Sequence, residues 1–192
     1  KYLYDLYKEA AMPFSWNAEL FAYAKQIGLL CFSTPFSRKG VDLLKSLDNP
    51  IYKIASFEVV DLELVDYVAR QGKPVILSSG IATDDELKTA IELIRSRGVS
   101  DITLLKCVSA YPAQIADMNL REMRLLGEKF GVKFGLSDHS LGNMAGIIAT
   151  SLGASVIEKH FILDKKIRSA DSAFSLDRTE FAEFVSAIRN AE

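Results

Sequence analysis

A regular alternation of short apolar runs and amphipathic segments restricts the folds open to this chain more than any other feature of its sequence. Each run has five or six residues that are apolar nearly throughout, as in strands covered on both faces. The sequence therefore predicts six strands. They cover residues 29–33, 52–56, 74–78, 102–107, 132–136 and 155–159.

Segments with the apolar period of a helix separate these runs. The clearest covers 84–97, where Thr83 and Glu86 form a capping box and Gly98 follows as a stop signal. The other expected helices cover 17–26, 41–47, 61–70, 120–130, 143–152 and a last segment that Asp177 and Glu180 cap.

Strands that each precede a helix indicate right-handed βαβ units and a parallel sheet. A doubly wound sheet and a (β/α)₈ barrel both fit this pattern, but no glycine-rich dinucleotide fingerprint follows any strand, which weakens the first. The strand spacing suits a barrel of about 250 residues. We therefore predict an α/β fold, a truncated TIM (β/α)₈ barrel in which residues 1–192 supply six of the eight βα units. The chain begins at Lys1 without a signal-peptide pattern, and we expect two further units upstream.

Composition narrows the classes of partner. The 23 basic and 25 acidic residues give a net charge of −2, which offers no electrostatic footprint for nucleic acid or an anionic membrane. No run approaches the roughly 18 apolar residues of a membrane span. Cys31 and Cys107 lie in apolar runs, which predicts buried free thiols rather than a disulfide scaffold. These features fit a cytoplasmic protein.

Hydroxyl side chains recur where the expected strands end. Because the carboxyl ends of parallel strands form one rim, these side chains are expected to converge there. Hydroxyls and a lysine on one rim suit a phosphate group, although each Ser or Thr would also serve to cap the helix that follows it. The hydroxyl residues are Thr34, Ser56, Ser78, Ser109 and Ser137.

The chain has two histidines, His139 and His160, and both follow neighbouring strands. Two neutral imidazoles on one rim suit a divalent metal with open coordination positions. The alternative is that each is an ordinary core or surface histidine, because their spacing matches no local metal motif.

Lys53 lies inside an apolar strand, where an unpaired ammonium group would be costly. It therefore needs an anionic partner, either a ligand or a carboxylate such as that of Glu58. Cys107 lacks a base in its own segment, which favours a buried inert thiol over a nucleophile.

Four segments resemble the sialic acid synthase family, whose enzymes condense phosphoenolpyruvate with an amino sugar to make nine-carbon 2-keto acids. They are Phe32-Ser-Thr-Pro-Phe36, Tyr52-Lys-Ile-Ala-Ser-Phe-Glu58, Gly135-Leu-Ser-Asp-His139 and Val156-Ile-Glu-Lys-His-Phe161. Three others resemble the pseudaminic acid synthase branch of that family. They are Tyr4-Asp-Leu-Tyr-Lys-Glu-Ala10, Lys106-Cys-Val-Ser-Ala-Tyr-Pro112 and Asp171-Ser-Ala-Phe-Ser-Leu176.

The resemblance implies a catalytic barrel that is often followed by a small antifreeze-like domain, in a homodimer. It implies a divalent cation on His139 and His160, commonly Mn²⁺, with Mg²⁺ or Co²⁺ as alternatives. It also implies catalytic roles for these histidines, Lys53 and Glu58. The residues implied for phosphoenolpyruvate are Thr34, Lys53, Ser56, Ser78, Ser109 and Ser137. Those implied for the sugar are Glu58, Tyr111, Glu158 and Asp171.

The branch-specific motifs favour a 2,4-diacetamido-2,4,6-trideoxy-altropyranose as the sugar and pseudaminic acid as the product. The chain departs from the family where Ser169-Ala170 replaces the usual Gly-Pro, and we expect the family's first two strands and its antifreeze-like domain to have no counterpart within residues 1–192. Three alternatives stay open. They are an N-acetylneuraminate synthase that uses N-acetylmannosamine, a non-catalytic barrel fragment, and an aldolase with a Schiff-base lysine at Lys106 or Lys159.

Overall fold

Five parallel strands in sequence order form one sheet in the computed structural model, which describes residues 3–167 and 169–192. The strands are β1 (Tyr52–Ile54), β2 (Val75–Ser78), β3 (Ile102–Cys107), β4 (Lys133–Asp138) and β5 (Val156–Lys159). The main helices are α1 (Leu3–Ala10), α2 (Trp16–Gln26), α3 (Arg38–Ser46), α4 (Leu62–Ala69), α5 (Asp84–Ser96), α6 (Leu120–Phe130), α7 (Met144–Ser151) and α8 (Arg178–Ala191). Two short 3₁₀ turns, η1 (Glu58–Val60) and η2 (Ile115–Asp117), follow β1 and β3.

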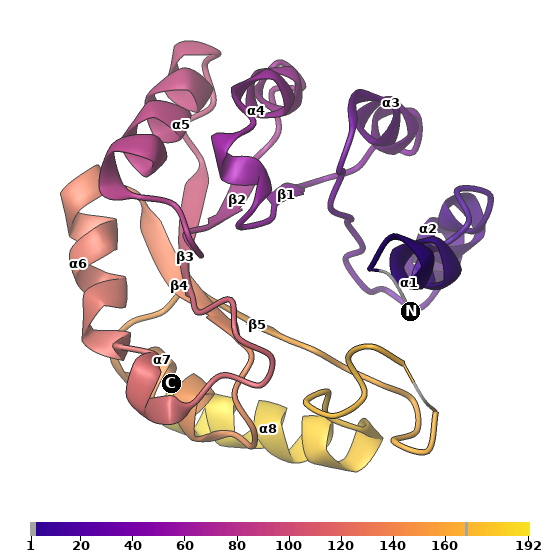
Figure 1. The fold of residues 1–192 in the computed structure, drawn as a ribbon, viewed down its shortest axis with the longest axis vertical. Coiled ribbons are helices and arrows are strands. Elements are labelled where there is room, and N and C mark those ends of the chain that lie inside the picture. The colour runs from indigo at the N-terminus through magenta and orange to yellow at the C-terminus, as the bar shows by residue number, and fades with distance from the viewer. Residues whose placement is uncertain (1–2, 168) are drawn as a thin grey trace.

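The strand order β1-β2-β3-β4-β5 places every crossover helix on the same side of the sheet. Right-handed crossovers that always advance in one direction give this single layer, whereas a doubly wound sheet reverses its order and covers both faces. Figure 1 shows α4, α5, α6 and α7 as an arc along the outer side of the strands. The sheet is therefore half of a barrel, and the doubly wound alternative is wrong.

The expected first strand at 29–33 is not part of this sheet. Its residues have no strand assignment, and its contact with the segment before β1 is a hydrogen bond from the Ser33 N–H to the Asn49 Oδ1 at 3.3 Å. Leu29 and Leu30 are 63% and 65% exposed. An apolar run becomes a strand only when a neighbour accepts its backbone hydrogen bonds, so its composition alone overpredicted the strand.

The other expected elements are confirmed, and side-chain capping explains where α5 and α8 begin. The Thr83 side chain accepts from the Glu86 N–H and the Glu86 carboxylate from the Thr83 N–H, which makes the predicted capping box of α5. Asp177 and Glu180 form the same arrangement at the start of α8. Each reciprocal pair satisfies backbone N–H groups that a helix start leaves without an intrahelical partner.

The core lies between the sheet and its outer helices. One cluster joins β1, β2 and β3 to α4 and α5, and it includes Ile54, Leu77, Ile91 and Leu104. A smaller cluster places Leu136 of β4 against α6 and α7. These side chains pack on the helix side of the sheet, and the alternate residues of each strand point to the opposite face.

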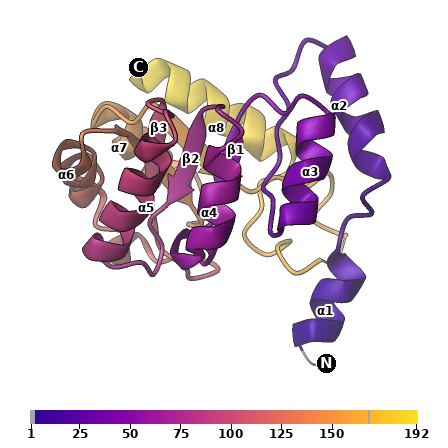
Figure 2. The same cartoon turned by 90° about the horizontal axis from the view of Figure 1, so that it is seen from above.

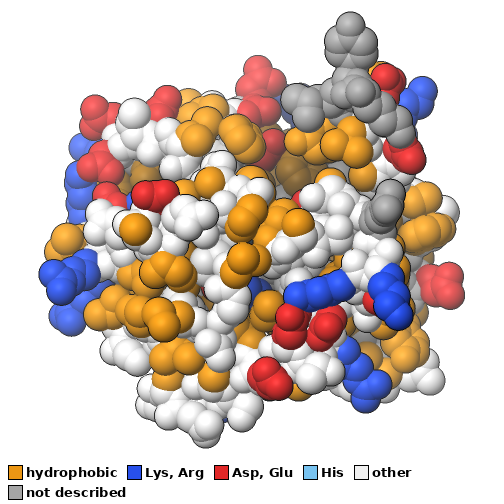
Figure 3. All heavy atoms as spheres, turned by 60° about the horizontal axis from the view of Figure 1, so that its bottom comes forward, with side chains coloured by type: hydrophobic (Ala, Val, Ile, Leu, Met, Phe, Trp, Pro, Cys, Tyr) orange, Lys and Arg blue, Asp and Glu red, His pale blue; other side chains and the backbone are white. Residues whose placement is uncertain are grey.

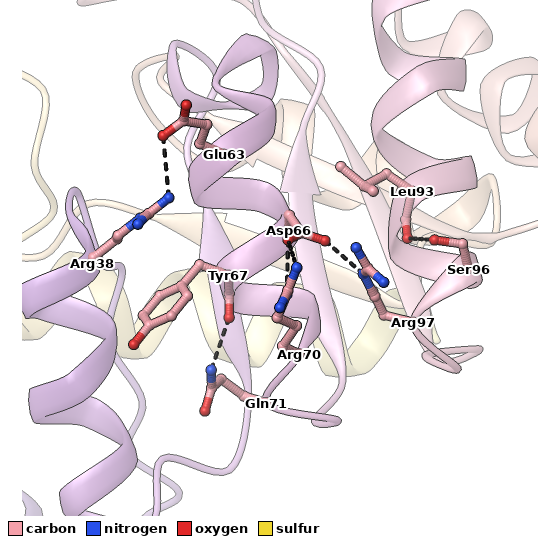
Figure 4. Close-up of polar contacts among 9 residues, drawn as sticks. All are labelled: Arg38, Glu63, Asp66, Tyr67, Arg70, Gln71, Leu93, Ser96 and Arg97. Carbon is pink, nitrogen blue, oxygen red and sulfur yellow. Dashed lines mark hydrogen bonds and ion pairs between the residues drawn. The ribbon is translucent and has the colours of Figure 1, made fainter.

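Ion pairs join the outer helices at the surface. Asp66 of α4 accepts from Arg70 at 2.8 Å and from Arg97, directly after α5, at 2.6 Å (Figure 4). The hydrogen bond from Arg97 is the main cause that lowers the pKa of Asp66. These groups lie on the outside of the half-barrel and stabilise helix packing modestly, as exposed pairs do.

The part of the chain before β1 leaves large apolar side chains uncovered. Figures 1 and 2 place α1, α2 and α3 beyond β1, away from the other strands. Trp16 and Tyr23 of α2 are 57% and 60% exposed. Figure 3 turns the bottom of the molecule as seen in Figure 1 toward the viewer, and hydrophobic side chains lie there in patches among acidic and basic groups. No helix within residues 3–167 and 169–192 is long and apolar enough to cross a membrane.

Candidate active site

Side chains from the two edges of the sheet meet on its inner face. Lys53 of β1 is buried, and its Nζ lies 3.3 Å from the Glu158 Oε2 of β5. Four strand spacings separate β1 from β5, which is about 19 Å in a flat sheet. A direct contact across that span requires strong curvature, so this ion pair defines the inner face of the half-barrel.

The anionic partner of Lys53 is therefore Glu158, not the Glu58 that sequence proximity suggested. Glu158 also accepts a hydrogen bond from the Ser137 hydroxyl of β4 at 2.6 Å. Its two carboxylate oxygens are thus divided between an ammonium group and a hydroxyl. This arrangement holds the Lys53 ammonium group on the inner face of the sheet, beside the Ser137 hydroxyl.

Hydroxyl groups gather at the same rim. The Ser56 and Ser109 Oγ atoms lie 3.2 Å apart, although 53 residues separate them in the chain. Gly80 makes this approach possible: it has a φ of +43°, and a Cβ there would lie 2.0 Å from the Ser56 Cβ. Thr34 is half-buried in the extended segment before α3, and within the described residues no hydrogen bond joins it to this group.

Two buried polar atoms of the described residues have no hydrogen-bond partner, and both belong to this rim. They are the Ser78 Oγ and the Glu58 Oε2. Burial raises the pKa of Glu58, and the nearby Lys53 offsets this shift only in part. A buried polar group without a partner is costly, so these atoms mark where a polar ligand would bind.

The two imidazoles lie side by side, with ring centroids 5.3 Å apart. The His139 Nδ1 lies 2.9 Å from the Val108 carbonyl oxygen, which accepts, so Nδ1 carries the hydrogen and Nε2 keeps its lone pair. The His160 Nδ1 lies 3.5 Å from the Asp171 Oδ2. Burial lowers the pKa of His160 and outweighs the opposite effect of Asp171.

This donor set fits a divalent cation. An acceptor beside each Nδ1 orients the ring and leaves Nε2 for a metal, which is a frequent arrangement in metal-binding histidines. The described residues hold no group of three or more His, Cys, Asp and Glu side chains placed for a metal. His139 and His160 alone would offer an ion two protein ligands, which would leave positions open for water or substrate.

Aromatic rings enclose the histidines. The Tyr111 ring centroid lies 4.3 Å from that of His139, and the Phe174 centroid lies 4.9 Å from that of His160. Phe174 is buried and also contacts Tyr111, at 5.4 Å between centroids. Sequence reasoning missed Phe174 as a site residue, although it lies inside the motif at 171–176. Burial raises the pKa of Tyr111.

The remaining candidates are two cysteines and two lysines. Cys107 is buried and burial raises the pKa of its thiol, as expected for an inert cysteine, whereas Cys31 is only partly buried, contrary to expectation. Lys106 pairs with Glu122 of α6 at 2.5 Å, and Lys159 pairs with Asp138 at 2.8 Å. Neither lysine is presented for a Schiff base.

A curved parallel sheet with this polar rim places the chain in the structural class of the sialic acid synthetases. An N-acetylneuraminic acid synthetase from Leptospira borgpetersenii, solved with citrate, superposes with a TM-score of 0.93 at 32% identity, over 97% of this chain and 65% of that one. The superposition of the two structures agrees with the α/β half-barrel of this chain.

The chain belongs to the NeuB family, whose sequence profile matches residues 1–192. A pseudaminic acid synthase from Helicobacter pylori is 57% identical over 189 residues, which cover 98% of this chain and 56% of the relative. One from Campylobacter jejuni subsp. jejuni serotype O:23/36 is 50% identical over 99% of this chain and 55% of the relative. The chain thus spans about half the length of the curated relatives it matches. Enzymes of the family generally use a divalent metal.

Proposed function

We propose that this chain forms part of a pseudaminic acid synthase, which condenses phosphoenolpyruvate with 2,4-diacetamido-2,4,6-trideoxy-altropyranose and releases phosphate. The observation that carries the proposal is the inner face where Lys53, Glu158 and Ser137 meet beside two oriented histidines. The 57% identity to a relative that bears this name supports the choice of substrate.

Phosphoenolpyruvate needs a cation and several hydrogen-bond donors for its phosphate and carboxylate oxygens. Lys53 supplies the charge, because its ammonium group is buried and faces the rim. Ser78 has a buried hydroxyl without a partner, and the paired hydroxyls of Ser56 and Ser109 lie on the neighbouring strand ends. The proposed set is Thr34, Lys53, Ser56, Ser78, Ser109 and Ser137.

The reaction forms one carbon–carbon bond and cleaves one carbon–oxygen bond. C3 of phosphoenolpyruvate attacks the aldehyde carbon of the open-chain sugar, whose oxygen takes a proton and becomes a hydroxyl. Water adds to C2, and the bond from C2 to the phosphate oxygen breaks, which leaves the 2-keto acid and inorganic phosphate. Six sugar carbons and three from phosphoenolpyruvate give the nine-carbon product.

The chain's own residues contribute by positioning and by fixed charge. We propose that Glu58, which has a raised pKa and a buried oxygen without a hydrogen-bond partner, binds the sugar together with Tyr111, Glu158 and Asp171. His139 and His160 hold a divalent cation, for which we propose Mn²⁺, with Mg²⁺ and Co²⁺ as alternatives. When bound, the cation supplies Lewis-acid polarisation of the sugar carbonyl.

The deciding assay is phosphate release from phosphoenolpyruvate in the presence of Mn²⁺. Release that depends on the diacetamido trideoxy sugar supports the proposal, and a preference for N-acetylmannosamine would favour an N-acetylneuraminate synthase instead. Replacement of His139 or His160 by Ala should abolish the metal-dependent turnover. Absence of release with either sugar, from the protein with its complete barrel, would leave a non-catalytic binding protein as the better interpretation.

We further propose that the chain forms part of a (β/α)₈ barrel, to which it supplies the strands β1 to β5, in a cytoplasmic homodimer without nucleic-acid or membrane partners. The fit to a longer solved relative and the open edges at β1 and β5 support the first part. Exposed sheet edges invite pairing, which supports association. The free thiols Cys31 and Cys107 support a reducing compartment. Light scattering and cell fractionation of the native protein test these points.

A further inference from the structure

The residues that precede the two histidines form a buried ion pair that the proposed reaction does not use. The Lys159 Nζ lies 2.8 Å from the Asp138 Oδ2, and the side chains are 2% and 0% exposed. The same ammonium group donates to the Ser140 carbonyl oxygen at 2.5 Å. The other oxygen of Asp138 accepts from the Ser140 N–H and hydroxyl at 2.8 and 2.7 Å. One ammonium group is thus tied to both residues that flank His139.

This ion pair lies behind the site, on the helix side of the sheet. Successive side chains of a strand point to opposite faces. Ser137 and Glu158 meet on the inner face, so Asp138 and Lys159 face outward. In agreement, the Lys159 Nζ lies 5.7 Å from the ring centroid of Phe184 in the outer helix α8. From this position the pair acts on the chemistry only through its neighbours in the chain.

The pair is also the last link between β4 and β5 before the histidines. Asp138 and Lys159 are the final partners in the register of these strands. Beyond them, each histidine carbonyl oxygen accepts from the backbone of a different segment. The spacing of His139 and His160 therefore depends on the contact directly before them.

Stability alone does not explain charges at this place. A buried ion pair loses the hydration of both groups, and apolar side chains of similar volume are often as stable or more stable. Charge-assisted hydrogen bonds do, however, fix distance and direction more strictly than apolar contacts. Lys159, Asp138 and Ser140 satisfy one another with four such contacts.

We propose that Asp138 and Lys159 are positioning residues that set the separation and orientation of the His139 and His160 imidazoles. The inference rests on the proposed function in one respect: the imidazoles it aligns are those proposed to hold the divalent cation. The pair itself touches neither the cation nor the substrates.

The test uses the double variant Asp138→Asn, Lys159→Met in the intact protein. Either single variant leaves one buried charge without a partner and disturbs folding for that reason alone. The double variant removes both charges, keeps similar side-chain shapes and is expected to melt close to the native protein. The matched control is Lys106→Met, Glu122→Gln, which removes the outward-facing ion pair of the neighbouring strand β3.

Two measurements test the proposal, one on the metal-free proteins and one on the proteins titrated with Mn²⁺. In crystals of the metal-free double variant, the 5.3 Å separation of the imidazole centroids should change by more than about 0.5 Å, the tolerance of a productive site. By calorimetry, Mn²⁺ affinity should fall by about 10- to 100-fold, as for other residues that orient metal ligands. The control variant should match the native protein in both.

A double variant with native stability, native ring separation and native Mn²⁺ affinity would overturn the proposal and leave the ion pair with a role in packing alone.

Failure of the proposed function gives a different result. If the His139→Ala variant binds Mn²⁺ as tightly as the native protein does, the metal assignment is wrong. The ring separation in metal-free crystals still decides the role of the pair, with a changed separation supporting it and an unchanged one refuting it.

Discussion

Replacement of Glu158 by Gln tests whether the inner-face ion pair stabilises the half-barrel. At 3.3 Å and an effective dielectric constant of about 20, the attraction between Lys53 and Glu158 is about 5 kcal/mol before solvent is considered. The Glu158 side chain is 38% exposed, so water screens much of this attraction. Gln also keeps an oxygen that accepts from Ser137. We expect Glu158→Gln to lower the free energy of unfolding by about 1–3 kcal/mol.

The matched control is Glu63→Gln. Glu63 pairs with Arg38 at 3.2 Å, almost the same distance, but the side chains are 83% and 64% exposed. Its loss should cost at most about 0.5 kcal/mol, because exposed pairs contribute little. Urea unfolding of both variants, in the presence and absence of inorganic phosphate, measures the difference. Phosphate should stabilise Glu158→Gln more than the native protein, because it replaces the charge lost beside Lys53.

Equal unfolding free energies for the two variants would refute this reasoning about burial. An equal effect of phosphate on the native protein and on Glu158→Gln would refute the placement of the anion beside Lys53. The two readouts are separate, so the structural role of the ion pair can stand when the ligand assignment fails.

Three further predictions concern single groups. Gly80→Ala should destabilise the protein by about 2–4 kcal/mol in thermal unfolding, because the new Cβ would lie 2.0 Å from the Ser56 Cβ at a φ of +43°. The control is Gly98→Ala, which has a φ of +85° and open space around it and should therefore destabilise the protein less. Glu58 has a folded-state pKa above its ordinary 4.5, so its contribution to stability is full below that pH and is lost as the pH rises through the folded-state pKa. Urea unfolding from pH 4 to 7 should therefore show a steeper fall for the native protein than for Glu58→Gln, and parallel curves would contradict the buried position of Glu58. Cys107 should react with a thiol reagent only after denaturant is added, since burial raises its pKa and blocks access; rapid labelling of the folded protein would contradict this.

Much of the fold follows from local sequence. The α5 segment carries its own start signal at Thr83, its apolar stripe and its stop at Gly98, and the structure has all three. The expected runs at 52–56, 74–78 and 102–107 became β1, β2 and β3 because their apolar residues pack on a helix layer. The run at 29–33 was equally apolar, but it has no strand beside it in the described structure.

The gathering of polar side chains at one rim could be predicted from the sequence, but their contacts could not. Reading the strand ends found Ser56, Ser109 and the two histidines, because parallel strands bring their carboxyl ends to one rim. It did not find the partner of Lys53, since Glu158 lies 105 residues further along the chain and at the opposite edge of the sheet. Phe174 was missed for the same reason, because its burial depends on rings from other segments.

The sequence by itself determined the alternation of strands and helices, the caps, and the residue types that reach the rim. These depend on interactions between residues a few positions apart, which a period or a motif records. Only the tertiary structure decided the curvature that joins Lys53 to Glu158 and the orientation of each imidazole. It also decided the pairing of Asp138 with Lys159 behind the imidazoles. These contacts require distant segments to meet, and no local pattern specifies which ones do.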